Sequence, residues 1–320
     1  MPEPQSIFDI LTHPGERLPA ISRWLLDQVW SSDRLEKLTP VEYLETGEKE
    51  VNRGEELILS SASSVYDEMT SASSRSPKLN DMFHEAPTAI VVLDGASIRE
   101  LPILKKLARQ TGFKVIEDGV RYAALPSDTL YYVEQRLIGK RVAPSELPKR
   151  QELKDSGICA VYYDAPIRTA NLSANQASYV LWSRFPDGTY KDMGSKFASH
   201  FGEMRRLYDT IWKNIILEVP RGYRIVITSD HGYIFFGTGL ESNRFPEAAR
   251  ILSHDRFKCF GDHEELPKES QGLQIIPEKR LAMLRGRIKN KPMGQSANNA
   301  YRHGGMSLME MLTPWLVIQR

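Results

Sequence analysis

From residue 88 onward, short apolar runs alternate with longer segments in which apolar residues recur every three or four positions. The apolar runs predict strands at residues 89–93, 113–116, 158–163, 179–185 and 223–229. The helical spacing predicts helices at residues 98–109, 129–138 and 194–217, and a closing helix and strand at 307–318. Because these strands are apolar on both faces, we expect an α/β fold with a mostly parallel central sheet and helices on both faces.

The first part of the chain does not follow this alternation. Apolar residues at helical spacing predict a helix near residues 17–30, and a polar, breaker-rich stretch at 71–77 predicts a linker or loop. We therefore expect a mainly helical N-terminal extension over residues 1–86, followed by one α/β domain over 87–320. Within that domain, residues 235–300 lack regular periodicity and are interpreted as an irregular insertion or lid.

Composition narrows the class of protein. The 320 residues are 41% hydrophobic and 26% charged, which is ordinary for a globular protein, and a net charge of +1 excludes a global basic field that would attract nucleic acid. Only Cys159 and Cys259 are present, so no disulfide framework is implied. The start of the chain does not read as a signal peptide, and no apolar run is long enough to span a membrane. We expect a cytoplasmic protein without membrane contact.

Two polar residues stand directly after one of the predicted strands. Asp230 and His231 follow the apolar run 225–227, and Gly232 would let the backbone turn sharply. Asp94 stands in the same way after the strand at 89–93. Carboxylates and imidazoles bind metal ions, and open α/β sheets place their sites at the carboxyl ends of strands. The alternative is a strand-end Asp followed by a turn-forming His-Gly.

A hydroxyl-rich segment opens the predicted helix at 129–138. Thr129 would lie near free backbone N–H groups and the positive end of the helix dipole, where phosphoryl oxygens can be held. This is a suitable place for a nucleophile that attacks phosphorus. The alternative is that Thr129 is the N-cap of the helix, a role that Ser127 could equally fill.

Four segments carry a family resemblance through their order and spacing across residues 88–318. They are Leu93-Asp94-Gly95, then Pro126-Ser127-Asp128-Thr129 with Gly139 ten residues later, then Thr228-Ser229-Asp230-His231-Gly232-Tyr233, then His303-Gly304-Gly305-Met306-Ser307 with Glu310 and Pro314. Together they resemble the alkaline phosphatase superfamily and, within it, the PglZ family. The resemblance implies an alkaline-phosphatase-like fold and a metal-dependent phosphatase or phosphodiesterase. Its substrate would be a nucleotide, a cyclic oligonucleotide or a nucleic acid, and partners in a phage-defence complex are implied as well.

The resemblance also implies roles for individual residues. Two divalent cations, Zn²⁺ or Mn²⁺, would be bound. The ligands of the first cation would be Asp94, Thr129, Asp230 and His231. Thr129 would be the metal-activated nucleophile, and His303 would belong to the second cation.

The chain departs from the family pattern at the second cation. The superfamily usually supplies an Asp and a His about four residues apart, but here Asp187 is followed at that spacing by Lys191. Asp187 or Asp192 is therefore the candidate carboxylate, and His200 is either a further ligand or a buried helix histidine. Lys191 could replace part of the missing charge and contact substrate. If the second site is incomplete, the alternative is a catalytically weak PglZ domain that acts as an interaction scaffold.

Three weaker patterns lie between residues 254 and 291. His254, Cys259 and His263 could form a structural zinc site, but without paired cysteines a lid or loop is the favoured interpretation. Arg256 could reach a substrate phosphate, although a solvated loop charge is the more common explanation. The basic run at 279–291 predicts either a nucleic-acid contact or a solvated helix face.

Overall fold

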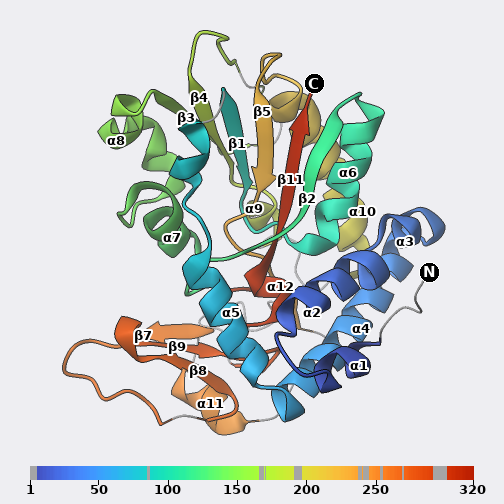
Figure 1. The fold of residues 1–320 in the computed structure, drawn as a ribbon, viewed down its shortest axis with the longest axis vertical. Helices are drawn as coiled ribbons and strands as arrows, with labels where there is room; N and C mark the ends of the chain where they lie inside the picture. The colour runs from blue at the N-terminus through green and yellow to red at the C-terminus, as the bar shows by residue number, and fades with distance from the viewer. Residues whose placement is uncertain are drawn as a thin grey trace.

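The computed structural model describes most of the chain. The described residues are 6–84, 87–165, 169, 171–190, 197–236, 240, 245–252, 255–268, 270–290 and 301–320, with only the backbone described at 84, 190 and 197–200. The fold is of the α/β class, as predicted, with a mostly parallel six-stranded sheet at its centre (Figure 1). No helix among these residues is long and apolar enough to cross a membrane.

The central sheet has the strand order β2-β11-β5-β1-β4-β3. Its strands are β1 (Thr88–Leu93), β2 (Lys114–Tyr122), β3 (Ile158–Tyr163), β4 (Ser178–Ser183), β5 (Arg224–Thr228) and β11 (Leu312–Gln319). Strands β3, β4, β1 and β5 are parallel, and β11 runs antiparallel to both β5 and β2. The parallel strands therefore all end at one edge of the sheet.

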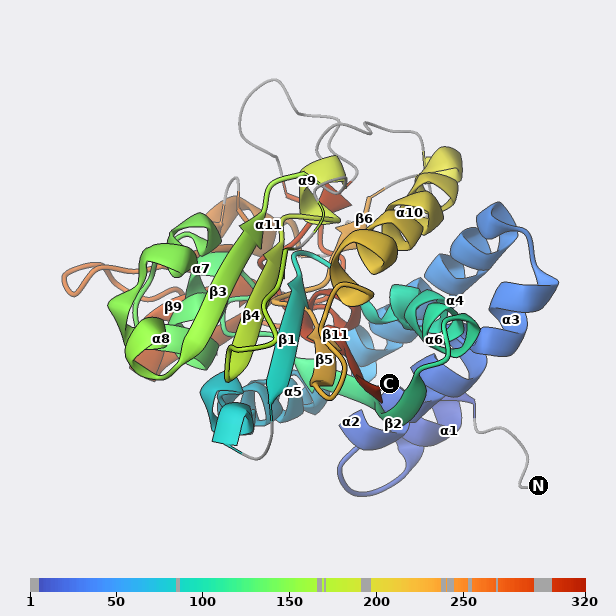
Figure 2. The same cartoon turned by 90° about the horizontal axis from the view of Figure 1, so that it is seen from above.

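Alternate residues of the inner strands pack into two different cores. Val91 and Leu93 face a core shared with α6 (Leu101–Gln110), α10 (Phe197–Ile211) and α4 (Pro40–Ser61). Ile90 and Val92 face a second core, which includes side chains of α7 (Thr129–Tyr132), the π-helical segment η4 (Val133–Ile138) and α8 (Gln151–Asp155). Figures 1 and 2 show these helices on opposite sides of the sheet. Burial on both faces explains why the strands are continuous apolar runs.

The N-terminal segment is helical and packs beside the sheet. Its α-helices are α1 (Ile7–Thr12), α2 (Leu18–Trp24), α3 (Ser32–Lys37), α4 and α5 (Ser64–Arg75), with η1 (Leu25–Val29) and η2 (Leu79–His84) between or after them. The prediction of a loop at 71–77 was wrong for most of that stretch. Helix α5 continues to Arg75 because its buried face includes Ser73, whose hydroxyl donates to the carbonyl of Ala123.

The stretch predicted to be irregular at 235–300 is partly folded. Its described residues include α11 (Pro246–Ile251) and an antiparallel sheet in the order β7-β9-β8, formed by Phe257–Cys259, Leu281–Leu284 and Leu273–Ile276. Figure 1 shows this small sheet below the central one. These strands have four residues or fewer, which is too short for a clear periodicity in the sequence.

The remaining elements are short. They are η3 (Ile98–Glu100), η5 (Pro144–Lys149), α9 (Asp187–Tyr190), η6 (Trp212–Ile216), β6 (Ile234–Phe235), η7 (Pro277–Lys279), β10 (Tyr301–Arg302) and α12 (Leu308–Met311). Strand β6 pairs with β10, which joins the segment after β5 to the segment before β11.

A close contact between α4 and Trp30 gives a stability prediction. A Cβ atom at Gly47 would lie 2.2 Å from the ring of the fully buried Trp30, so Gly47→Ala should lower the free energy of unfolding by about 1–3 kcal/mol. Gly54 is the matched control on the same helix, because its nearest neighbours would be 3.4 Å away. Gly54→Ala should be neutral or stabilising by up to about 1 kcal/mol. Urea unfolding of both variants tests this, and equal effects would contradict it.

Candidate metal centre

Three neighbouring parallel strands deliver polar residues to the same edge of the sheet. Asp230 and His231 follow β5, Asp94 follows β1, and Asp187 begins α9 shortly after β4. Because the strand order is β5-β1-β4, these residues lie side by side. The backbone N–H of Asp187 donates to the carbonyl of Asp94 at 2.8 Å. This hydrogen bond holds the segment after β4 against the segment after β1.

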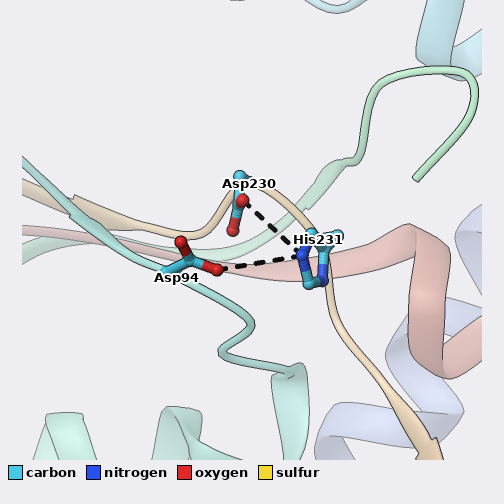
Figure 3. Close-up of side chains that lie close together, drawn as sticks. All are labelled: Asp94, Asp230 and His231. Carbon is cyan, nitrogen blue, oxygen red and sulfur yellow. Dashed lines mark ion pairs between the residues drawn. The ribbon is translucent and has the colours of Figure 1, made fainter. Parts of the chain in front are cut away.

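Asp94, Asp230 and His231 form a compact cluster of possible ligands. One side-chain atom from each lies within 4.8 Å of the others. His231 Nε2 is 3.8 Å from Asp94 Oδ1 and 3.6 Å from Asp230 Oδ2 (Figure 3). Asp230 and His231 are fully buried, and Asp94 is 8% exposed. In the part of the chain that the structure describes, this is the cluster that could hold a metal ion.

The partners of Asp230 support a cation at this place. Its Oδ1 accepts from the backbone N–H of Gly95 at 3.0 Å, and its Oδ2 accepts from the Thr129 hydroxyl at 2.6 Å. Among the described residues, its hydrogen bonds and ion pairs involve no Lys or Arg, although the carboxylate is fully buried. A buried carboxylate beside a second one is costly unless a positive charge compensates it. Two carboxylates, an imidazole and a hydroxyl suit Zn²⁺ or Mn²⁺.

The imidazole of His231 is oriented by the backbone of the next residue. Nδ1 lies 2.9 Å from the carbonyl oxygen of Gly232, a contact in which Nδ1 is the donor. Nε2 is then the nitrogen that faces Asp94 and Asp230, and it is the one that a metal ion would bind. Burial lowers the pKa of His231, but the carboxylates of Asp230, Asp187 and Asp128 and the hydrogen bond to Gly232 together outweigh burial, and the net pKa is raised. A cation and a proton therefore compete for Nε2.

The N-cap of α7 is neither Thr129 nor Ser127. Asp128 is the N-cap, and its side chain accepts from the backbone N–H of Leu130 at 3.0 Å. Ser127 instead donates its hydroxyl hydrogen to the carbonyl of Gly305. The Thr129 hydroxyl is thus not used for capping and lies 2.6 Å from Asp230 Oδ2 and 3.4 Å from His231 Nε2.

A second pair of predicted ligands lies beside this cluster. The His303 ring stacks on the His231 ring, with centroids 4.0 Å apart and planes inclined by 9°. His303 Nε2 is 3.9 Å from Asp187 Oδ1. The structure therefore brings Asp187 and His303 together next to the first site. Asp192, Lys191 and the side chain of His200 lie outside the described residues.

Gly95 and Gly232 allow close approach around the site. Gly95 has φ +74°, and a Cβ atom there would lie 2.9 Å from the hydroxyl oxygen of Tyr301. Gly232 was expected to serve a sharp turn. Gly232 does not have a positive φ. A Cβ atom there would lie 2.1 Å from the carbonyl oxygen of Met309, so it is tight packing against α12 that requires glycine.

The predicted substrate contact of Arg256 does not fit the structure. Arg256 is 1% exposed, and its guanidinium pairs with Glu310 through Nε at 2.6 Å and Nη2 at 3.0 Å. It also donates to the carbonyls of Gly286 and Ile288. A buried carboxylate at Glu310 needs a paired cation, and Arg256 supplies it. Arg256 therefore holds the segment that follows His303.

The other weak patterns also have structural explanations. In the basic run 279–291, Arg285 and Arg287 are buried, so these two form neither a solvated face nor a nucleic-acid surface. The Cys259 thiol contacts the hydroxyl of Tyr131 at 2.9 Å. Among the described residues, no metal cluster forms around Cys259 and His263, and His254 lies outside them.

Two residues that orient the site were not predicted. Trp182 on β4 donates from its indole N–H to Asp94 Oδ2 at 3.3 Å. The Ser229 hydroxyl lies 2.6 Å from the carbonyl oxygen of Leu93 and 2.7 Å from that of His231, and so ties β5 to β1. Ser229 belongs to the quoted Ser-Asp-His segment, which could have singled it out. Trp182 carries no such signal, because its position in an apolar run is typical of a core residue.

Metal binding should stabilise the folded protein. A ligand that binds only the folded state at 100 times its Kd adds about 2.7 kcal/mol to the free energy of unfolding. We expect Mn²⁺ to raise the thermal midpoint of the parent, and Asp230→Asn to remove most of this rise. Asp164→Asn is the matched control, because Asp164 is an exposed carboxylate after the parallel strand β3. Calorimetric scans with and without Mn²⁺ test this, and an equal rise in Asp230→Asn would contradict the site.

No family model matches the chain, and no curated protein matches it significantly. The function is therefore inferred from the motifs and from the geometry of the site.

Proposed function

We propose that this protein is a metal-dependent hydrolase of phosphate esters of the PglZ type. One observation carries the proposal: the Thr129 hydroxyl donates to Asp230 Oδ2 at 2.6 Å within a buried cluster whose donors suit a divalent cation. The parallel strands that end at this cluster support an alkaline-phosphatase-like fold. The proposed substrate is a phosphodiester or phosphomonoester of a nucleotide, a cyclic oligonucleotide or a nucleic acid, and action within a defence complex is part of the proposal.

Each residue has a distinct role in the proposed reaction. Asp94, Asp230 and His231 would hold a cation, which when bound favours the alkoxide of a neighbouring hydroxyl and offsets charge on phosphoryl oxygens. Thr129 would be the nucleophile, oriented by its hydrogen bond to Asp230. Its attack would form the Oγ–P bond and break the ester P–O bond, and the departing alcohol would take up a proton. Water would then hydrolyse the phosphothreonine and restore Thr129.

Asp187 and His303 are the residues proposed for a second cation. Their side chains lie 3.9 Å apart, and His303 stacks on His231. A second cation there would stabilise the leaving oxygen. The scaffold alternative remains because Lys191 stands where the family has a histidine. A scaffold would keep the fold and its partners but would turn over phosphate esters weakly or not at all.

Substitution of Thr129 tests the nucleophile. Thr129→Ala should lower kcat for a chromogenic phosphodiester by several orders of magnitude, since it removes the attacking oxygen, while Thr129→Ser should retain part of the activity. The fold should persist because Asp128, not Thr129, caps α7. Leu130→Ala is the control, because Leu130 is the next residue and is 42% exposed. If Thr129→Ala is as active as the parent, Thr129 is not the nucleophile.

Chelation tests the dependence on metal. Excess EDTA should abolish phosphodiesterase activity because the cation is needed to form the alkoxide at neutral pH, and Mn²⁺ or Zn²⁺ should restore it. Initial rates before chelation, after chelation and after each addition provide the measurement. Activity that persists in excess EDTA would rule out the metal-dependent reaction.

A further inference from the structure

The backbone that follows the two ligands of β5 is held by side chains from distant parts of the chain. We refer to residues 229–235 as the ligand loop. The carbonyl oxygen of Tyr233 accepts from Nη2 of Arg99 at 3.0 Å, and that of Phe235 accepts from Nη1 of Arg287 at 3.1 Å. The guanidinium of Arg99 also lies 3.9 Å from the centroid of the Tyr233 ring. Two arginines therefore fix the position of the loop just beyond His231.

Both arginines are paired with the same carboxylate, Glu48 on α4. Arg99 Nη2 lies 2.7 Å from Glu48 Oε1, and Arg287 Nη2 lies 2.5 Å from Glu48 Oε2. The side chains of all three residues are 0% exposed. Burial opposes the ionisation of Glu48, but the guanidiniums of Arg287 and Arg99 outweigh burial and hold its pKa below the usual value. Glu48 is therefore charged at neutral pH, and the cluster is an ionic triad.

The geometry of the triad couples the N-terminal helix to the ligand loop. A guanidinium presents several donors in one rigid plane, so a carboxylate that fixes part of the plane also fixes the direction of the other donors. Here Glu48 contacts two such planes, and one donor of each ends on the ligand loop: Nη2 of Arg99 on the carbonyl of Tyr233, and Nη1 of Arg287 on the carbonyl of Phe235. A change at Glu48 would therefore alter the backbone that follows the metal ligands.

We propose that Glu48 is a positioning residue for the candidate metal centre, acting through Arg99 and Arg287 on the ligand loop. The N-terminal helices are then part of the working site and not a separable extension. The proposal rests on the proposed function only in taking Asp230 and His231 as metal ligands.

A merely structural role for the triad predicts a different result. If the triad only stabilised the fold, its removal would lower the free energy of unfolding but leave the Mn²⁺ affinity of the folded protein unchanged. If it positions the ligand loop, the affinity of the folded protein falls. Residues that orient metal ligands typically change metal affinity by about 10–100-fold when substituted.

The experiment compares a variant in which the ionic triad is removed with a control variant on the same helix in which the triad is intact. Glu48→Leu/Arg99→Met removes one anion and one cation together, and it leaves Arg287 beside Glu55 at 3.5 Å. The variant removes one charge of each sign. The buried carboxylate of Glu100 loses the nearby charge of Arg99 but still accepts hydrogen bonds from the Ser97 backbone N–H and the Tyr233 hydroxyl. Glu50→Gln is the matched control, because Glu50 lies on the same helix and pairs with Arg34, away from the ligand loop. Mn²⁺ affinity is measured by titration calorimetry on full-length protein at a temperature where circular dichroism shows each variant folded.

We expect Glu48→Leu/Arg99→Met to bind Mn²⁺ about tenfold more weakly than the parent, with Glu50→Gln unchanged. Parent-like affinity in the double variant would overturn the positioning role. If the double variant does not fold, Arg287→Met, which keeps Glu48 paired with Arg99, takes its place with the same criterion. Asp230→Asn separates the two proposals: if the parent binds no Mn²⁺, or Asp230→Asn binds it equally well, the proposed function fails and the positioning role fails with it.

Discussion

The buried carboxylate of Asp230 is the constraint on which the site depends. Removed from water, it needs partners for both oxygens, and it finds them in the amide of Gly95 after β1 and the hydroxyl of Thr129 at the start of α7. Three segments far apart in the sequence are thereby joined at one side chain. The imidazole of His231 and the carboxylate of Asp94 complete the cluster, and the remaining negative charge is what a divalent cation would balance.

Buried ion pairs also join distant segments of the chain around this site. Arg256 pairs with Glu310 and so holds the segment after His303, while Glu48 pairs with two arginines that reach the ligand loop. Apolar side chains could fill such positions with equal or greater stability, because desolvating charges is costly. Charged groups add directional hydrogen bonds, because each guanidinium donates to particular carbonyl oxygens and so fixes their positions. This agrees with the proposal that the N-terminal helices help to position the site.

The sequence predicted local features well where one physical cause dominates. Strands buried on both faces appear as continuous apolar runs, so the inner strands and the α/β class could be predicted from residues 88–229. The prediction at 71–77 was wrong because the buried face of α5 outweighed its breaker-rich composition. The prediction for Arg256 was wrong because the local sequence does not distinguish an arginine exposed on a loop from one buried in an ion pair.

By itself, the sequence determined which residues follow the strands, and hence that Asp94, Asp230 and His231 would be near one edge of the sheet. Parallel strands all end at the same edge of a sheet, and the strand order found in the structure makes β5 and β1 neighbours there. Only the tertiary structure decided that Asp128 caps α7 and leaves the Thr129 hydroxyl to Asp230, that His303 stacks on His231, and that Glu48 reaches the ligand loop. These contacts join residues 51 or more positions apart, the separation of Glu48 and Arg99, or depend on the choice between neighbouring side chains, and no local pattern encodes either.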